Sequence, residues 1–190
     1  MANQNAAYGL RPVRHLGGGE IRCNEYTIAS AYGTAIYKGD VVQQTTDGSL
    51  ILAEAGNVDN VGVFDGVRYV DSNGRQQFSP YWPASTVATE IKALVYDDPM
   101  IVFQMQSDAT GAAALDVAMG ADWEVVAGNA RTGQSASNLD VSAGLAGTGK
   151  SLRILRIVDD GVNVAGAYSV VEVLFNEHVM KGVVSGVGGI

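Results

Sequence analysis

Short β-prone runs separated by turn residues constrain this chain more than any other feature of its sequence. From Glu20 to Glu54 the runs EYTIAS, TAIYKGDVVQQ and SLILAE are rich in Ile, Val, Tyr and Thr, and glycine-containing turns separate them. β-Branched and aromatic residues favour strands, whereas Gly and Asp favour tight turns. The 24 glycines among 190 residues agree with many short connections. We therefore expect a mainly β protein, folded as a compact β-barrel or β-sandwich.

Two dipeptides predict β-hairpins. Asp47-Gly48 lies between TAIYKGDVVQQ and SLILAE, and Asn73-Gly74 lies within NVGVFDGVRYVDSNGRQQFSPYW. These dipeptides suit the tight turns that join antiparallel strands. After Asn73-Gly74 the chain is expected to return as a strand through Gln77 and Phe78.

The segment SPYWPAS is expected at a sheet edge or at the exit from the sheet. Pro80 and Pro83 have no backbone N–H to donate to a central ladder. Tyr81 and Trp82 between them are either core residues or anchors of an interface.

The second half of the chain predicts further strands, one short helix and one long loop. EIKALVY and PMIVFQMQS are expected as strands joined by a turn at Asp97-Asp98-Pro99, and SLRILRIV and AYSVVEVLFNEH as two more strands. In GAAALDVAMGADW, a helix would place Leu115, Ala118 and Met119 on one face. Residues 128–150 are rich in Gly, Ser, Ala and Asn and predict a long functional or mobile loop. In AYSVVEVLFNEH, alternation puts Val171, Val173 and Phe175 on one face and Tyr168, Val170 and Glu172 on the other.

The chain is expected to hold one β-rich domain with two terminal extensions. Residues 1–20 lack strand or helix periodicity and predict an extended N-terminal arm, with Gly17–Gly19 as a joint. Its apolar side chains must pack either on the protein itself or on a neighbour. Residues 21–182 form the expected single domain, and the glycine-rich residues 183–190 predict a flexible tail.

Charge and composition exclude several classes of partner. The formal net charge is −8, so we expect no nucleic-acid binding through a broad basic surface. Residues 1–22 carry a net +2, which leaves −10 on the remainder. Such a segment can dock on an acidic neighbour, although three arginines are also common by chance. No apolar run is long enough to span a membrane, and we expect no membrane partner. Cys23 is the only cysteine and therefore cannot form an intramolecular disulfide.

The sequence GLAGTGKS, Gly144 to Ser151, matches the phosphate-loop pattern G-x-x-x-x-G-K-[ST]. A phosphate loop follows a buried strand and opens a helix. Here a polar segment precedes the motif and a β-prone run follows it, so nucleotide binding is kept as a remote alternative only. The two histidines, His15 and His178, have no suitably spaced serine elbow or second metal ligand. We expect no catalytic residues, no metal and no cofactor.

Five stretches of sequence carry a resemblance to a known group of proteins. They are NAAYGLRPVRHL, EYTIAS, GVRYVDSNGRQQFSPYWPASTVAT, ALVYDDP and AYSVVEVLFNEH. The chain resembles the capsid decoration, or cement, proteins of tailed bacteriophages from about Asn5 to His178, and the resemblance weakens in residues 128–150.

That resemblance implies a structural protein of the virion, made in the bacterial host cytoplasm and placed on the capsid exterior. It implies bridging of major capsid protein subunits and self-association, as a trimer in preference to a dimer. On this interpretation the arm supplies the partner contacts, through Tyr8, Leu10, Arg11, Val13 and Arg14. A tail or head–tail connector subunit is the alternative, because such subunits are also β-rich and oligomeric.

Overall fold

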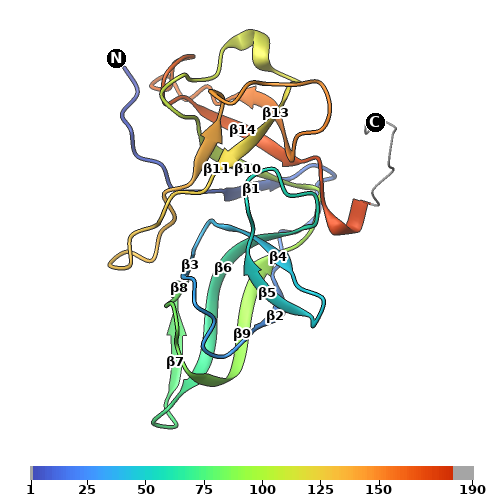
Figure 1. Cartoon of the computed structure of the whole chain (residues 1–190). Coiled ribbons are helices and arrows are strands. Elements are labelled where there is room, and N and C mark those ends of the chain that lie inside the picture. The colour runs from blue at the N-terminus through green and yellow to red at the C-terminus, as the bar shows by residue number, and fades with distance from the viewer. Residues whose placement is uncertain (1, 182–190) are drawn as a thin grey trace.

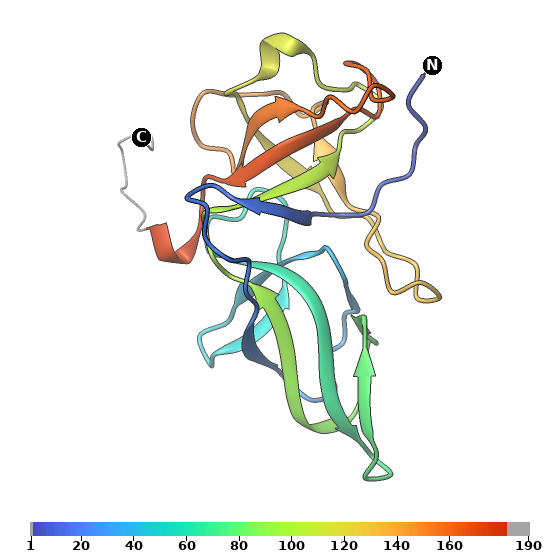
Figure 2. The same cartoon turned by 180° about the vertical axis from the view of Figure 1, so that it is seen from behind.

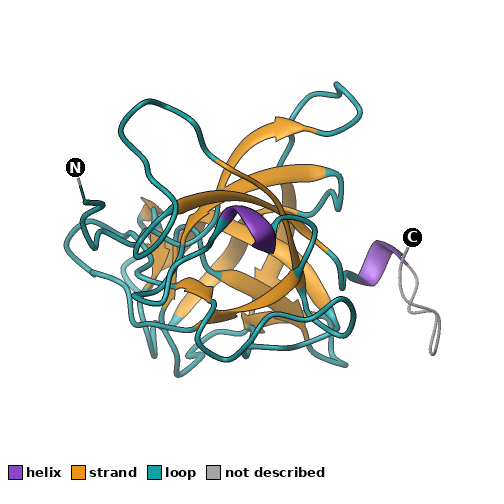
Figure 3. Ribbon diagram, turned by 90° about the horizontal axis from the view of Figure 1, so that it is seen from above, coloured by secondary structure: helices purple, strands orange, loops and turns teal. Residues whose placement is uncertain are grey.

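A closed five-stranded barrel forms one end of the molecule, and a six-stranded sheet forms the other (Figure 1). The computed structural model describes residues 2–181. Within that range the only helices are two short 3-10 turns, η1 (Ala114–Asp116) and η2 (Val179–Lys181), and strands dominate the view from above (Figure 3). The prediction of a mainly β protein with a barrel is confirmed.

The barrel end is called the barrel lobe. Its strands are β2 (Asn24–Ile28), β4 (Val41–Gln44), β5 (Ser49–Leu52), β6 (Asn60–Asp71), β7 (Gln76–Ser79) and β9 (Ala88–Tyr96). The strand order is β4-β5-β2-β9-β6, and a further pairing of β4 with β6 closes the barrel. β7 pairs with β6 outside the closed ring. Apolar side chains from all five barrel strands fill the interior, including Ile28, Val42, Leu50, Phe64 and Val95.

Both predicted hairpins are confirmed. β4 and β5 pair antiparallel across Asp47-Gly48, and β6 and β7 do so across Asn73-Gly74. Gly74 has a φ of 74°, the left-handed conformation that glycine adopts at little cost.

The SPYWPAS segment leaves the sheet, as its two prolines predict. β8 (Tyr81–Trp82) pairs with β3 (Ile36–Tyr37) in a separate two-stranded sheet. Trp82 is completely buried and belongs to the barrel core. The ring of Tyr81 stacks on that of Tyr37 at 5.4 Å between centroids. Trp82, expected either as a core residue or as an anchor of an interface, is a core residue.

The other end is called the sheet lobe. Its strands are β1 (Arg11–His15), β10 (Ile101–Gln106), β11 (Gly120–Glu124), β12 (Asn138–Asp140), β13 (Leu152–Ile157) and β14 (Val170–Phe175), in the order β1-β10-β14-β13-β11-β12. A bridge between Ser107 and Leu139 brings the ends of β10 and β12 together, so the sheet curls. The predicted alternation in β14 buries Val171, Val173 and Phe175 in a second, separate core.

The barrel lobe is inserted in the chain between β1 and β10 of the sheet lobe. The incoming and outgoing segments lie side by side where the lobes meet (Figure 2). The Leu16 N–H donates to the Met100 carbonyl at 2.8 Å, and His15 Nε2 lies 3.1 Å from Asp98 Oδ2. The segment Asp97-Asp98-Pro99, expected as a turn between neighbouring strands, therefore carries the chain from one lobe to the other.

The prediction of a helix in residues 111–123 is wrong. η1 covers one turn only, Ala118 has a φ of 70°, and the chain continues as β11. Leu115, expected on one face of that helix with Ala118 and Met119, is 93% exposed. The buried apolar residues are Ala121 and Trp123, which alternate as in a strand. Pairing of β11 with β12 and β13 prevails over the weak helical pattern.

Residues 128–150 contain β12 and make several buried contacts. Ser135, Ser137 and Leu139 are at most 2% exposed. The expected tail, residues 183–190, lies outside the described residues.

Candidate interaction surface

The N-terminal segment, residues 2–16, packs on the protein itself. The Asn3 side-chain amide donates to the carbonyls of Val164 and Ala167 at 2.7 and 3.0 Å. The Gln106 side chain accepts from the Ala6 N–H at 2.8 Å and donates to the Gln4 carbonyl at 2.9 Å. The structure thus shows this segment packed on the protein itself. Residues 11–15 of the expected arm form strand β1, which pairs with β10.

The five expected partner-contact residues fall into different environments. Leu10 is 2% exposed and belongs to the sheet-lobe core, so its expected role as a partner contact is corrected: its side chain is not available at the surface. Val13 is half-buried at a bulge in β1. The guanidinium of Arg11 lies 4.4 Å from the centroid of the Tyr8 ring, and Arg11 is exposed. Arg11 and Arg14 are therefore the exposed members of the set, and Tyr8, like Val13, is half-buried.

Arg14 takes part in an ion-pair network across the sheet lobe. Its Nη2 lies 2.9 Å from Glu172 Oε2, and Arg156 Nη2 lies 2.6 Å from Glu172 Oε1. The Glu172 side chain is 2% exposed, whereas Arg14 and Arg156 are 43% and 59% exposed. The hydrogen bond from Arg156 is the largest cause that lowers the pKa of Glu172, burial opposes it, and Arg14 lowers it further. Sequence alternation placed Glu172 on the face of β14 opposite Val171, Val173 and Phe175, but it gave no sign of this burial.

A polar junction joins the N-terminal segment to both lobes. The Asp40 carboxylate, 3% exposed, accepts from Ser135 Oγ at 2.5 Å, Ser137 Oγ at 3.3 Å and the Tyr37 N–H at 2.8 Å. Burial raises the pKa of Asp40, and these hydrogen bonds oppose the increase. The Gln134 side-chain amide donates to the carbonyls of Tyr8 and Lys38 at 2.8 and 3.0 Å.

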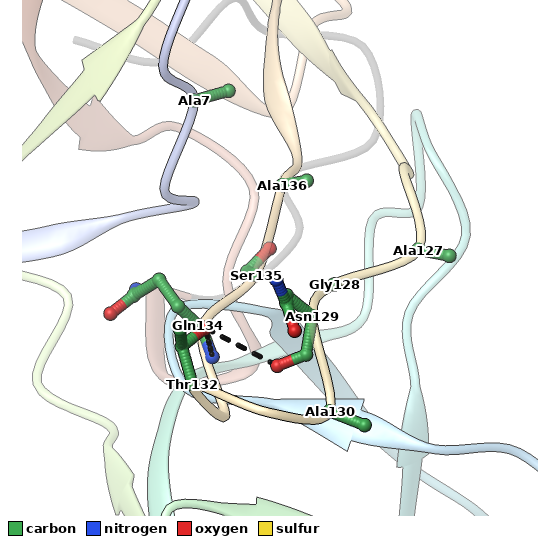
Figure 4. A pocket seen from close by; sticks show the side chains of 9 residues that line it. All are labelled: Ala7, Ala127, Gly128, Asn129, Ala130, Thr132, Gln134, Ser135 and Ala136. Carbon is green, nitrogen blue, oxygen red and sulfur yellow. Dashed lines mark hydrogen bonds between the residues drawn. The ribbon is translucent and has the colours of Figure 1, made fainter.

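An open groove of about 730 Å³ lies beside this junction (Figure 4). It is lined by Ala7 of the N-terminal segment and by Ala127, Gly128, Asn129, Ala130, Thr132, Gln134, Ser135 and Ala136. None of these side chains is charged. The hydroxyl of Ser135 already donates to Asp40. The groove therefore offers surface for contact and no acid, base or activated nucleophile.

The phosphate-loop pattern has intramolecular partners in place of phosphate. Lys150 Nζ lies 2.9 Å from Asp122 Oδ2, and the Ser151 N–H donates to Asp122 Oδ1 at 3.0 Å. Ser151 Oγ donates to the Asn57 carbonyl at 2.9 Å, and strand β13 follows directly. Since no helix begins there, the nucleotide alternative gains no support from the geometry.

The two histidines serve local structure. Nδ1 of His15 accepts from the N–H groups of Gly17 and Gly19 at 3.1 and 3.0 Å. His178 is 1% exposed, its Nδ1 accepts from the Met180 N–H, and burial lowers its pKa. Among residues 2–181, no three His, Cys, Asp or Glu side chains lie close enough to hold a metal ion.

One exposed feature was not identified from the sequence. Phe78 on β7 is 71% exposed, and it is the only exposed aromatic side chain among residues 2–181. The hairpin itself was predicted, but its position outside the closed barrel was not, because that depends on which strands close the ring.

Comparisons of the chain with protein-family models, with curated proteins and with solved structures found no match. Within residues 2–181, none of the helices is long and apolar enough to cross a membrane.

Proposed function

We propose that this chain is a structural protein of a tailed-bacteriophage head, which decorates the capsid exterior and cements it by bridging major capsid protein subunits without catalysis. The sequence resemblance supports this proposal, and so does the β-rich body. A cement protein acts by burying surface across the seams between subunits, which stabilises the assembled shell relative to separated subunits.

The observation that carries the proposal is the pair formed by the half-buried Tyr8 and the exposed Arg11. Their stacked side chains lie on an N-terminal segment of net charge +2, whereas the rest of the chain carries −10. Aromatic residues and arginine are enriched at the centres of protein interfaces. We propose that this pair contacts an acidic surface of the major capsid protein.

Two contacts hold the pair in place before binding. The Tyr8 carbonyl accepts from Gln134, and the Leu10 N–H donates to the Gly39 carbonyl at 2.8 Å. A segment that is already ordered loses less conformational entropy when it binds than a free arm would. The proposed contact is therefore a docked edge of the protein and not an extended tether.

The proposal is tested by incubating purified protein with expanded capsids that lack it and measuring the bound copies. Arg11→Glu should weaken binding at least about tenfold, which corresponds to about 1.4 kcal/mol. Arg22→Glu, which makes the same charge change at a side chain that is 77% exposed and lies outside residues 2–16, is the matched control and should bind like the unmodified chain.

Equal binding of the Arg11→Glu and unmodified proteins would refute the role of this pair. A density map of the purified virion then tests the location: density for the chain in the tail or connector, or its absence from the virion, would reject head decoration.

A further inference from the structure

Strand β7 has a free edge with unpaired backbone groups. In the described part of the chain, β7 pairs with β6 and with no other strand. The Asp71 N–H donates to the Arg75 carbonyl at 2.9 Å, which makes Asp71 and Arg75 a hydrogen-bonded pair. Because hydrogen-bonded and non-bonded pairs alternate in antiparallel strands, Tyr69–Gln77 is bonded and Arg68–Phe78 is not. The N–H and C=O groups of Phe78 therefore point away from β6.

The same alternation applies to Gln76, which lies opposite Val70. The outer edge of β7 thus presents two N–H groups and two C=O groups, from Gln76 and Phe78. Both side chains are also exposed, on the same face of the strand. Phe78 therefore combines a free backbone edge with an exposed aromatic ring.

The edge strand β1 of the sheet lobe is protected against strand addition, whereas β7 is not. Pro12 lies in β1, a bulge interrupts the register between Pro12 and Arg14, and two arginines belong to the strand. Proline, bulges and charged residues are common devices against strand addition at an edge. β7 has none of these devices, since its sequence is Gln-Gln-Phe-Ser.

We propose that β7 pairs with β7 of a second copy of this chain, antiparallel and about a two-fold axis through Gln77. Gln76 of each copy then lies opposite Phe78 of the other, and the four outward groups of each edge form four backbone hydrogen bonds. The two Phe78 rings become diagonal neighbours on one face, within reach of each other. The edge is self-complementary, as a two-fold interface requires.

Charge also favours a second copy at this edge. The chain has a net charge of −8, and its copies repel each other over much of the surface, but Gln76–Ser79 carries no charge. In the proposed register, Arg75 lies opposite Ser79, so no charged residue faces a like charge. A four-residue strand covers less than the roughly 1,200–2,000 Å² of stable complexes. The contact is therefore weak in dilute solution and strengthened where copies are held close together.

The inference deepens the proposed function by placing self-association at a named strand edge, with a two-fold axis in place of the trimer that the resemblance implies. It rests on that function only for the place where the contact is used. Its test uses purified protein without capsids, so its failure leaves the capsid-binding result unaffected. In a Cys23→Ser background, Gln77→Cys places two thiols opposite each other at a non-bonded pair. Cα atoms of such pairs are about 4.5 Å apart, within the range for a disulfide.

Mild oxidation should cross-link the Gln77→Cys protein at least about tenfold faster than Ser72→Cys, an exposed control in the adjacent turn. Adding Phe78→Pro to Gln77→Cys should remove this advantage, because proline lacks one of the outward N–H groups. Circular dichroism checks that the variants remain folded. Equal cross-linking rates for the Gln77→Cys and Ser72→Cys proteins would overturn the proposal. It would also be overturned if Phe78→Pro left the rate unchanged.

Discussion

A Cβ atom added to Gly9 would lie against the carbonyl oxygen of Gly39 and 2.8 Å from Cβ of Ser135. Gly9 has a φ of 72°, and its N–H donates to the Ser137 carbonyl at 3.0 Å. The N-terminal segment can therefore approach the junction between the lobes only because residue 9 has no side chain.

Gly9→Ala should destabilise the protein by about 2–4 kcal/mol, from the left-handed conformation and from the clash together. Gly18→Ala is the matched control. Gly18 has a φ of 75°, but a Cβ atom added there would have no heavy atom within 4 Å. The control should cost about 1–2 kcal/mol at most. Urea denaturation measures both, and equal losses would show that the close approach does not matter.

The Arg14–Glu172–Arg156 network should make stability depend on acid pH. The pKa of Glu172 is lowered below its ordinary value of 4.5, so its stabilising contribution is complete above pH 4.5 and is lost as the pH falls through the lowered value. Glu172→Gln should cost about 1–3 kcal/mol at pH 7. Denaturation from pH 7 down to pH 3 should show this difference shrinking below pH 4.5, and a constant difference would contradict the assignment.

Asp40 should give a pH dependence of the opposite sign. Burial raises its pKa above the ordinary value of 3.8, so the folded state retains a proton that the unfolded state loses. Stability due to this group is present below pH 3.8 and declines as the pH rises through the raised value. In Asp40→Asn this decline should be absent. The stability of the unmodified protein minus that of the variant should therefore fall with rising pH, and a rise would exclude a raised pKa.

Lys150 should contribute to stability and not to nucleotide binding. Lys150→Met removes the ion pair with Asp122, in which both side chains are 18% exposed, and should cost about 1 kcal/mol. Calorimetric titration of the unmodified protein with Mg²⁺-ATP and Mg²⁺-GTP should show no micromolar affinity. Binding that disappears in Lys150→Met would instead establish a phosphate site.

Features fixed by neighbouring residues could be predicted from the sequence. The hairpins at Asp47-Gly48 and Asn73-Gly74 depend on local turn chemistry, and both are present. The prediction of a helix in residues 111–123 is wrong because a short run rich in Ala, Leu and Met suits either period, and strand pairing with distant segments determines the structure.

Features that depend on long-range contacts could not be predicted. Leu10 is buried because β1 pairs with β10. The buried Glu172 forms an ion pair with Arg14, which lies on β1 and is distant in the sequence. No local pattern reports such partners. For the candidate surface, the sequence named Tyr8 and Arg11, but only the structure separates these accessible residues from Leu10 and reveals Phe78.

The insertion of the barrel between β1 and β10 sets an order on folding. During synthesis β1 leaves the ribosome first, but its partner β10 follows only after the whole barrel has been made. The barrel has all of its strands in one continuous stretch, so we expect it to form early, whereas closing the sheet lobe must wait for contacts of high sequence separation. The nascent chain therefore carries an unpaired β1 until β10, at residues 101–106, has also been made.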